Sequence, residues 1–69
     1  MKKYNQIIRE LREDHDKTQK QIADLLGTSK QYYGKYELGK RPLPIEHLIT
    51  LADYYHVTTD YILGRTDKK

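Results

Sequence analysis

The apolar residues of this chain recur at the spacing of helices rather than of strands. The first apolar stripe consists of Tyr4, Ile7, Ile8 and Leu11. Its i, i+3, i+4, i+7 spacing predicts an amphipathic helix that ends near residues 14–16. Further stripes of this kind run through residues 22–26 and 45–55. No stretch of useful length alternates apolar and polar residues, so we expect helices and no sheet.

The polar residues between the stripes predict where two of the helices begin and end. Thr18, with Gln21 three residues later, has the pattern of a capping box at a helix N-terminus. Gly27 suits the left-handed residue that ends such a helix, and Ser29 or Thr28 can cap the next one. A linker this short makes two helices cross steeply, which is the geometry of a helix-turn-helix.

The rest of the chain completes a five-helix prediction. Pro42 and Pro44 cannot lie inside a helix, although Pro44 could be a first helical residue. Thr58 is a suitable N-cap for a last short helix that ends at Gly64. We therefore expect an all-α bundle of five short helices, followed by a frayed tail.

Positive charge is concentrated in the part of the chain that holds the helix pair. Residues 1–41 carry ten Lys and Arg against six Asp and Glu, a net charge of +4. Residues 42–64 carry a net charge of −3, and residues 65–69 a net charge of +2. This distribution is typical of a nucleic-acid-binding surface, although a solvated surface with chance asymmetry would also explain it. The length predicts one domain over residues 1–64 and a flexible basic tail over residues 65–69.

The helix pair also carries a recognisable set of residues. They are Thr18, Gln19, Ala23, residues 26–29, Tyr36, Glu37 and residues 39–41. In combination they resemble the xenobiotic-response-element family of helix-turn-helix proteins, which includes the phage repressor and Cro DNA-binding domains. The resemblance covers about residues 4–64. It implies a compact five-helix, lambda-repressor-like fold in which the second and third helices form the helix-turn-helix.

The resemblance also implies which residues contact DNA bases. It places residues 30–38 as the recognition helix in the major groove. The base-reading candidates are Lys30, Gln31, Gly34 and Lys35. Glutamine can pair with adenine and lysine can donate to guanine, which supports the choice, whereas an ordinary solvated helix face is the alternative. Gly34 either permits a close approach of the backbone to DNA or is simply tolerated.

Other residues are candidates for phosphate contacts, which position a protein without reading sequence. They are Gln19, Lys20, Tyr32, Lys40 and Arg41. Gln19 matches a phosphate-binding glutamine of the family, at a helix N-terminus where free N–H groups attract anions. A flexible charged loop is the alternative for the last two. By the same resemblance, Arg12 and Glu37 are expected to form a partly buried ion pair with a structural role.

The aromatic residues are seven tyrosines, with no Phe or Trp. Those expected to face the core are Tyr4, Tyr33, Tyr36, Tyr55 and Tyr61. We expect their hydroxyls to lie near the surface, because a buried phenol needs a hydrogen-bond partner.

Catalytic and metal chemistry find little support in the sequence. The chain has no cysteine, its three histidines lack metal-ligand spacing, and no nucleophile elbow or phosphate loop is present. We expect no enzyme activity, metal or cofactor. Without a membrane-length apolar run or a signal-peptide pattern, we expect a cytoplasmic protein.

The function that these features predict is sequence-specific binding to double-stranded DNA by a transcriptional regulator, most simply a repressor that blocks access. A homodimer on a palindromic operator is expected, because one such domain contacts little of the groove. Residues 57–63 either form the dimer surface or close the core. The alternative function is an antitoxin-like protein-binding module with secondary DNA binding; RNA binding is disfavoured because no aromatic stacking platform is present.

Overall fold

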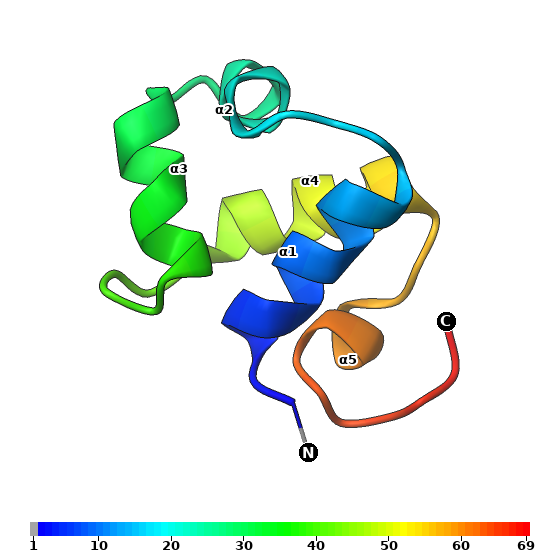
Figure 1. The fold of residues 1–69 in the computed structure, drawn as a ribbon. Coiled ribbons are helices and arrows are strands. Elements are labelled where there is room, and N and C mark those ends of the chain that lie inside the picture. The colour runs from blue at the N-terminus through cyan, green and yellow to red at the C-terminus, as the bar shows by residue number, and fades with distance from the viewer. Residues whose placement is uncertain (1) are drawn as a thin grey trace.

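The computed structural model, which describes residues 2–69, contains five helices and no strand in that range (Figure 1). The helices are α1 (Tyr4–Asp14), α2 (Gln19–Leu26), α3 (Lys30–Glu37), α4 (Ile45–Tyr55) and α5 (Thr59–Ile62). The all-α prediction with five helices is therefore confirmed. None of these helices is long and apolar enough to cross a membrane.

The predicted helix boundaries around the turn are confirmed by their capping hydrogen bonds. The N–H of Gln21 donates to Thr18 Oγ1 at 3.1 Å, and the N–H of Thr18 donates to Gln21 Oε1 at 2.8 Å. Gly27 ends α2 with a φ of 72°, a conformation in which glycine carries no steric penalty. Ser29, the first of the two candidate caps, accepts the N–H of Tyr32 at 3.1 Å and begins α3.

Pro44 precedes α4 instead of forming its first residue. Its ψ of 151° is extended, and its carbonyl accepts the N–H of Leu48 at 3.0 Å, which makes it the N-cap. Helix α4 thus begins at Ile45, one residue after the earliest start that the sequence permitted.

The C-terminal end of the fold lies against the N-terminal end. Gly64 follows α5 with a φ of 77°, and a Cβ there would lie 2.6 Å from the carbonyl oxygen of Lys2. Beyond it, the N–H of Thr58 donates to the carbonyl of Lys69 at 3.2 Å. The flexibility of residues 65–69 stays a prediction.

The core combines aliphatic and tyrosine side chains from all five helices. Its buried members are Ile7, Ile8, Leu11, Ile22, Ala23, Leu26, Tyr33, Tyr36, Leu51, Ala52, Tyr55 and Ile62, with Tyr4 and Tyr61 partly buried against them. The expectation that every tyrosine hydroxyl lies near the surface is wrong for Tyr33 and Tyr55. Their hydroxyls are buried without a hydrogen-bond partner, because these rings fill the centre of a core that has no Phe or Trp.

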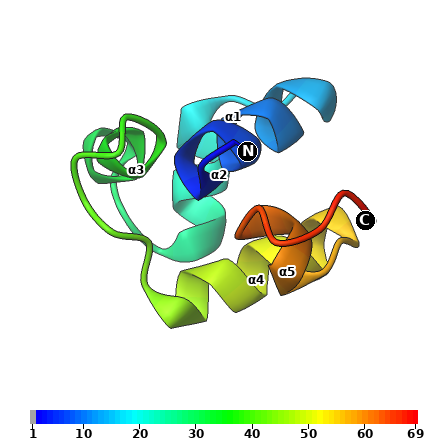
Figure 2. The ribbon, with the colours of Figure 1, turned by 90° about the horizontal axis from the view of Figure 1, so that it is seen from below.

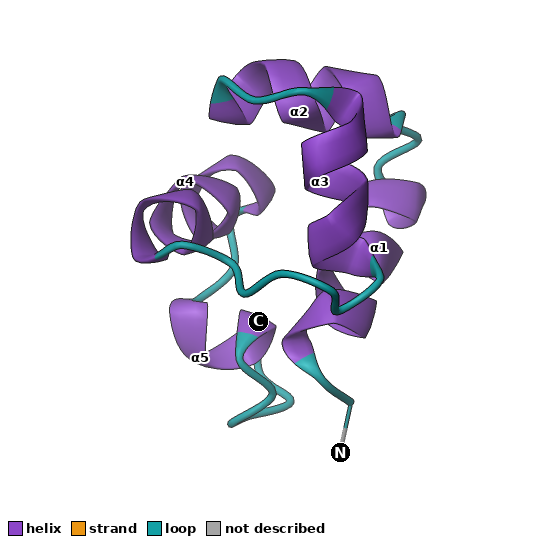
Figure 3. Ribbon diagram, turned by 90° about the vertical axis from the view of Figure 1, so that its left-hand side faces the viewer, coloured by secondary structure: helices purple, strands orange, loops and turns teal. Residues whose placement is uncertain are grey.

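Helix α3 lies along one side of the molecule, with the C-terminus on the other (Figures 1 and 2). When the molecule is viewed from the side of α3, no other helix passes in front of α3 (Figure 3). At the opposite end, Ile62 of α5 is fully buried, whereas Leu63 is 45% exposed. Within residues 57–63, Val57, Tyr61 and Ile62 pack against the core, whereas Thr58, Asp60 and Leu63 are exposed. A role of these residues in a dimer stays a prediction.

Candidate nucleic-acid interface

A shallow hollow of about 430 Å³ runs along the outer face of α3. It is lined by Gln19, Lys30, Gln31, Gly34, Lys35, Leu38 and Lys40. The surface thus brings together all four residues expected to read bases and two of those expected to bind phosphate. Leu38 also lines it, 67% exposed at the end of the helix, and was not among the sequence candidates.

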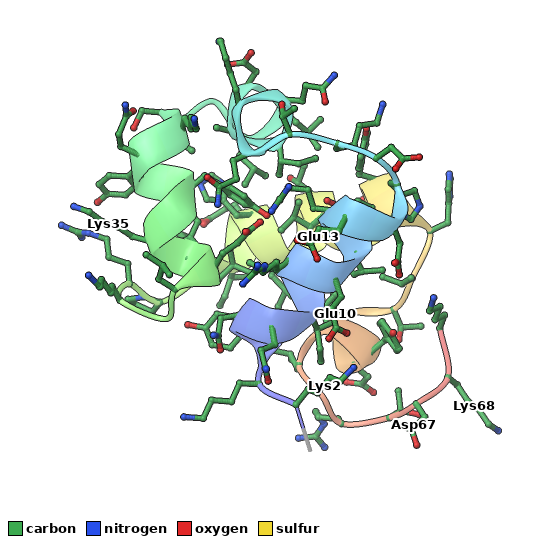
Figure 4. The ribbon with its side chains drawn as sticks, in the orientation of Figure 1. Lys2, Glu10, Glu13, Lys35, Asp67 and Lys68 are labelled. Atoms are coloured by element: carbon green, nitrogen blue, oxygen red, sulfur yellow. The ribbon has the colours of Figure 1, made fainter. Side chains whose placement is uncertain are left out.

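The position of α3 follows from its sequence. Tyr33 and Tyr36, three residues apart, are buried, so that face of the helix packs into the core. Lys30, Gln31 and Lys35 are exposed on the remaining face. Lys35 extends from α3 away from the body of the molecule (Figure 4). The amine of Lys35 and the side-chain amide of Gln31 can therefore contact a molecule outside the protein.

The charge on this face is uncompensated. Within residues 2–69, no carboxylate lies within 4.0 Å of the cationic groups of α3 or of the loop that follows it. Those groups belong to Lys30, Lys35, Lys40 and Arg41. Lys20 differs, because its amine lies 3.3 Å from Asp24 Oδ2 within α2. The four unpaired cations give the face the positive potential that an anionic polymer requires.

Glu37, the only carboxylate of α3, is buried and paired. Arg12 of α1 donates from Nε to Oε2 at 2.7 Å and from Nη2 to Oε1 at 3.1 Å. The side chain of Arg12 is only 13% exposed and that of Glu37 only 3%. Arg12 also donates from Nη1 to the carbonyl of Lys17 at 2.9 Å, in the loop before α2. The bidentate pair keeps the carboxylate away from the exposed face of α3 and joins α1 to α3.

The pair also shifts both ionisation equilibria toward the charged forms. Burial by itself would raise the pKa of Glu37, but Arg12, the nearby Tyr33 hydroxyl and Gln19 outweigh it and lower the pKa. The hydrogen bond to Glu37 correspondingly raises the pKa of Arg12. Glu37 is therefore ionised in the folded protein at neutral pH, and its charge is matched within the fold.

Gln19 has a second role that the sequence did not indicate. Its Nε2 donates to Glu37 Oε1 at 3.1 Å, so the amide at the start of α2 is tied to the end of α3. A Cβ on Gly34 would lie 3.7 Å from Gln19 Oε1, so the two residues are neighbours. The side chain expected to contact phosphate is held at the edge of the hollow by the buried ion pair.

A second hollow of about 300 Å³ adjoins the first and shares with it Gln19, Gly34 and Leu38. Arg9 and Arg12 of α1 also line it. Arg9 was not singled out from the sequence, where its partner Glu13, at 3.3 Å in the structure, makes it look like an ordinary surface residue. Its position three residues before Arg12 puts both side chains on the same side of α1, and this spacing could have indicated that Arg9 also lines the hollow.

Comparison with known proteins assigns the family. A helix-turn-helix family model matches residues 8–62 of the chain. The chain belongs to this helix-turn-helix family. Its helix-turn-helix is the α2–α3 pair described above, and the family model extends to the last residue of α5.

Individual relatives agree with this assignment. The chain is 44% identical over 64 residues to the uncharacterized HTH-type transcriptional regulator YobD of Bacillus subtilis, covering 93% of this chain and 57% of YobD. It is 40% identical over 50 residues to the cryptic phage CTXphi transcriptional repressor RstR of Vibrio cholerae, covering 72% of this chain and 45% of RstR. The chain thus spans about half the length of these curated relatives, which are named as a transcriptional regulator and a transcriptional repressor.

The fold is also that of a solved repressor. The structure of the P22 c2 repressor, determined in complex with a synthetic operator, superposes with a TM-score of 0.84 over 96% of this chain and 100% of that one. The sequence identity is 20%, so the likeness establishes the shared helix-turn-helix fold.

Proposed function

We propose that this helix-turn-helix chain is a transcriptional regulator that binds double-stranded DNA sequence-specifically and represses by steric blocking. The observation that carries the proposal is the hollow along α3, which collects amide and ammonium groups on a face whose four cations have no carboxylate partner within residues 2–69. Names of relatives support it, since RstR is called a transcriptional repressor. Such a protein acts in the compartment that holds the DNA, the cytoplasm.

The proposed base-reading residues are Lys30, Gln31 and Lys35, with Gly34 between them. Their side chains offer the donors and acceptors that distinguish base pairs in the major groove. Helix α3 has eight residues, and its exposed face is open to a groove of B-DNA, which admits one α-helix.

The proposed phosphate contacts flank this helix on both sides. Gln19 and Lys20 lie at the start of α2, where their own N–H groups, the first two of the helix, are also available to an anion. Tyr32, Lys40 and Arg41 lie on or beyond α3. Lys20 contributes least, because Asp24 already neutralises part of its charge.

Salt dependence tests this proposal. Release of counterions from the three phosphates assigned to Lys20, Lys40 and Arg41 predicts a slope of log K against log salt of about −3 for one domain and about −5 for two. Binding of one domain to duplex DNA is thus expected to weaken about fortyfold between about 50 and 200 mM salt. Binding that is unchanged over this range contradicts the proposal and favours an antitoxin-like protein-binding module.

We also propose that two copies bind as a homodimer to inverted half-sites of a palindromic operator, since a two-fold protein matches a two-fold site. Sequences selected from random duplex DNA should then contain paired half-sites about one helical turn apart. Removing one half-site should change the stoichiometry from two chains to one. Selection of single, unpaired sites would contradict the dimer.

A further inference from the structure

The loop that follows α3 is tied to that helix in two places. The backbone N–H groups of Lys40 and Arg41 both donate to the carbonyl of Lys35, at 2.9 and 3.4 Å. Gly39 makes this return possible with a φ of 75°. Pro42 then restricts the backbone of Arg41 toward an extended conformation. The base of the Arg41 side chain is therefore placed beside the helix.

The second tie is between side chains. The guanidinium carbon of Arg41 lies 4.7 Å from the centre of the Tyr32 ring, within the range of a cation–π contact. The amine of Lys35 lies farther away, at 5.9 Å from the same ring. A planar guanidinium stacks on an aromatic ring better than an ammonium group does, so Arg41 is the main partner.

The orientation of the Tyr32 ring is itself fixed by a contact with a buried ring. Its ring meets that of Tyr36 edge to face, with centroids 5.9 Å apart and planes at 90°. Tyr36 is buried and in turn contacts His47 of α4, at a centroid distance of 5.9 Å. The stacking surface offered to Arg41 thus rests on the core, whereas Tyr32 itself is 38% exposed.

The stacked guanidinium keeps its binding capacity. Within residues 2–69, it makes no ion pair and donates no side-chain hydrogen bond. The ring contacts one side of the group, so the N–H donors that point away from the ring stay available to a planar or tetrahedral anion. Ordering a long flexible side chain on a ligand costs entropy, and part of that cost is already met here.

We propose that Tyr32 is a positioning residue, whose ring holds the Arg41 guanidinium beside α3 as a preorganised phosphate-binding arm. The inference rests on the proposed function and adds to it a role for the Tyr32 ring that differs from a phosphate contact by its hydroxyl. On this proposal, the Arg41 side chain is ordered, in contrast to the flexible charged loop that was the alternative for residues 40–41.

The stack can be tested in the free protein by NMR. Ring currents should shift the Arg41 δ-methylene protons upfield of those of the exposed Arg9. The shift should persist in Tyr32→Phe, which keeps a ring, and disappear in Tyr32→Leu. An Arg41 shift that is the same in wild type and Tyr32→Leu overturns the proposal, whatever the protein does with DNA.

The consequence for binding can be tested with a mixed-sequence DNA duplex. Arg41→Ala should weaken binding several-fold and reduce the salt slope by about 0.9. Measured relative to Tyr32→Phe, which already lacks the hydroxyl, Tyr32→Leu should lose most of the affinity that Arg41 contributes. The Tyr32→Leu/Arg41→Ala variant should then bind no more weakly than Tyr32→Phe/Arg41→Ala. Losses that add in the double variant overturn the proposal. In a Tyr32→Phe background, Arg41→Ala should still produce its full loss, since any loss in Tyr32→Phe alone reports on the hydroxyl.

Tyr54→Leu is the matched control, because Tyr54 is 36% exposed and lies on α4, away from the hollow. It should leave DNA binding unchanged, and thermal unfolding of every variant checks the fold. If the wild-type chain shows no salt-dependent binding to duplex DNA, the proposed function fails, whereas the NMR measurement still decides the stack.

Discussion

Gln19 Nε2 donates to Glu37 Oε1 across 3.1 Å, and so joins the start of α2 to the end of α3. Glu37 is at the same time the bidentate partner of Arg12. One buried carboxylate therefore holds three helices together and orients an amide at the edge of the candidate DNA surface. The structural pair and one proposed phosphate-binding residue, Gln19, thus form one network.

Removing the carboxylate should destabilise the fold strongly. Glu37→Ala leaves the buried guanidinium of Arg12 without a counterion, which typically costs about 3–5 kcal/mol. Chemical denaturation would measure this loss. Asp24→Ala is the control, because it breaks an exposed pair with Lys20 that is worth less than about 1 kcal/mol. A loss for Glu37→Ala as small as that of the control would contradict a structural role for the pair.

Stability should also depend on pH through Glu37. Its pKa is lower in the folded chain than the ordinary value of 4.5, so the unfolded chain binds the proton more readily. The contribution of the carboxylate is complete above pH 4.5 and is lost as the pH falls through the folded pKa. The stability difference between wild type and Glu37→Gln should therefore shrink in acid. The other carboxylates are common to both proteins and cancel, so a constant difference would show that the pKa is not lowered.

Two classes of DNA-contact variants should behave differently. Alanine at Gln31 or Lys35 should cost about 1–3 kcal/mol on the preferred site and relax the choice of base. Alanine at Gln19 or Lys40 should weaken binding to all sequences alike. Binding to a randomised site library measures both effects. Identical profiles for the two classes would contradict the proposed division between base and phosphate contacts.

Gly34 should respond to substitution in opposite ways in folding and in binding. An added Cβ would meet only the Gln19 amide, at 3.7 and 3.9 Å, which is ordinary contact. Gly34→Ala should therefore stabilise the fold by up to about 1 kcal/mol, since glycine is a poor helix former. The same methyl group would project into the hollow and weaken DNA binding. A stabilised variant with unchanged DNA affinity would show that this glycine is simply tolerated.

Local sequence was sufficient for most of the helix boundaries. The capping box at Thr18, the cap at Ser29 and the stop at Gly27 each depend on residues within one helical turn. The stripe of Ile7, Ile8 and Leu11 likewise indicated which face of α1 is buried. Pro44 was the exception, because its fixed φ suits both the N-cap and the first helical position.

The sequence by itself determined the five helices, the buried faces of α1, α2 and α3 and the positive charge of residues 1–41, because helical periodicity, capping and charge are local properties. In α4 the apolar stripe was misleading, because Ile45 and Ile49 are exposed. Only the tertiary structure decided that Gln19 binds Glu37, that Arg41 stacks on Tyr32, and that the hydroxyls of Tyr33 and Tyr55 are buried. Each of these contacts depends on the angle and depth at which helices and loops pack. Residues distant in sequence, or joined through a turn, meet only once that packing is set.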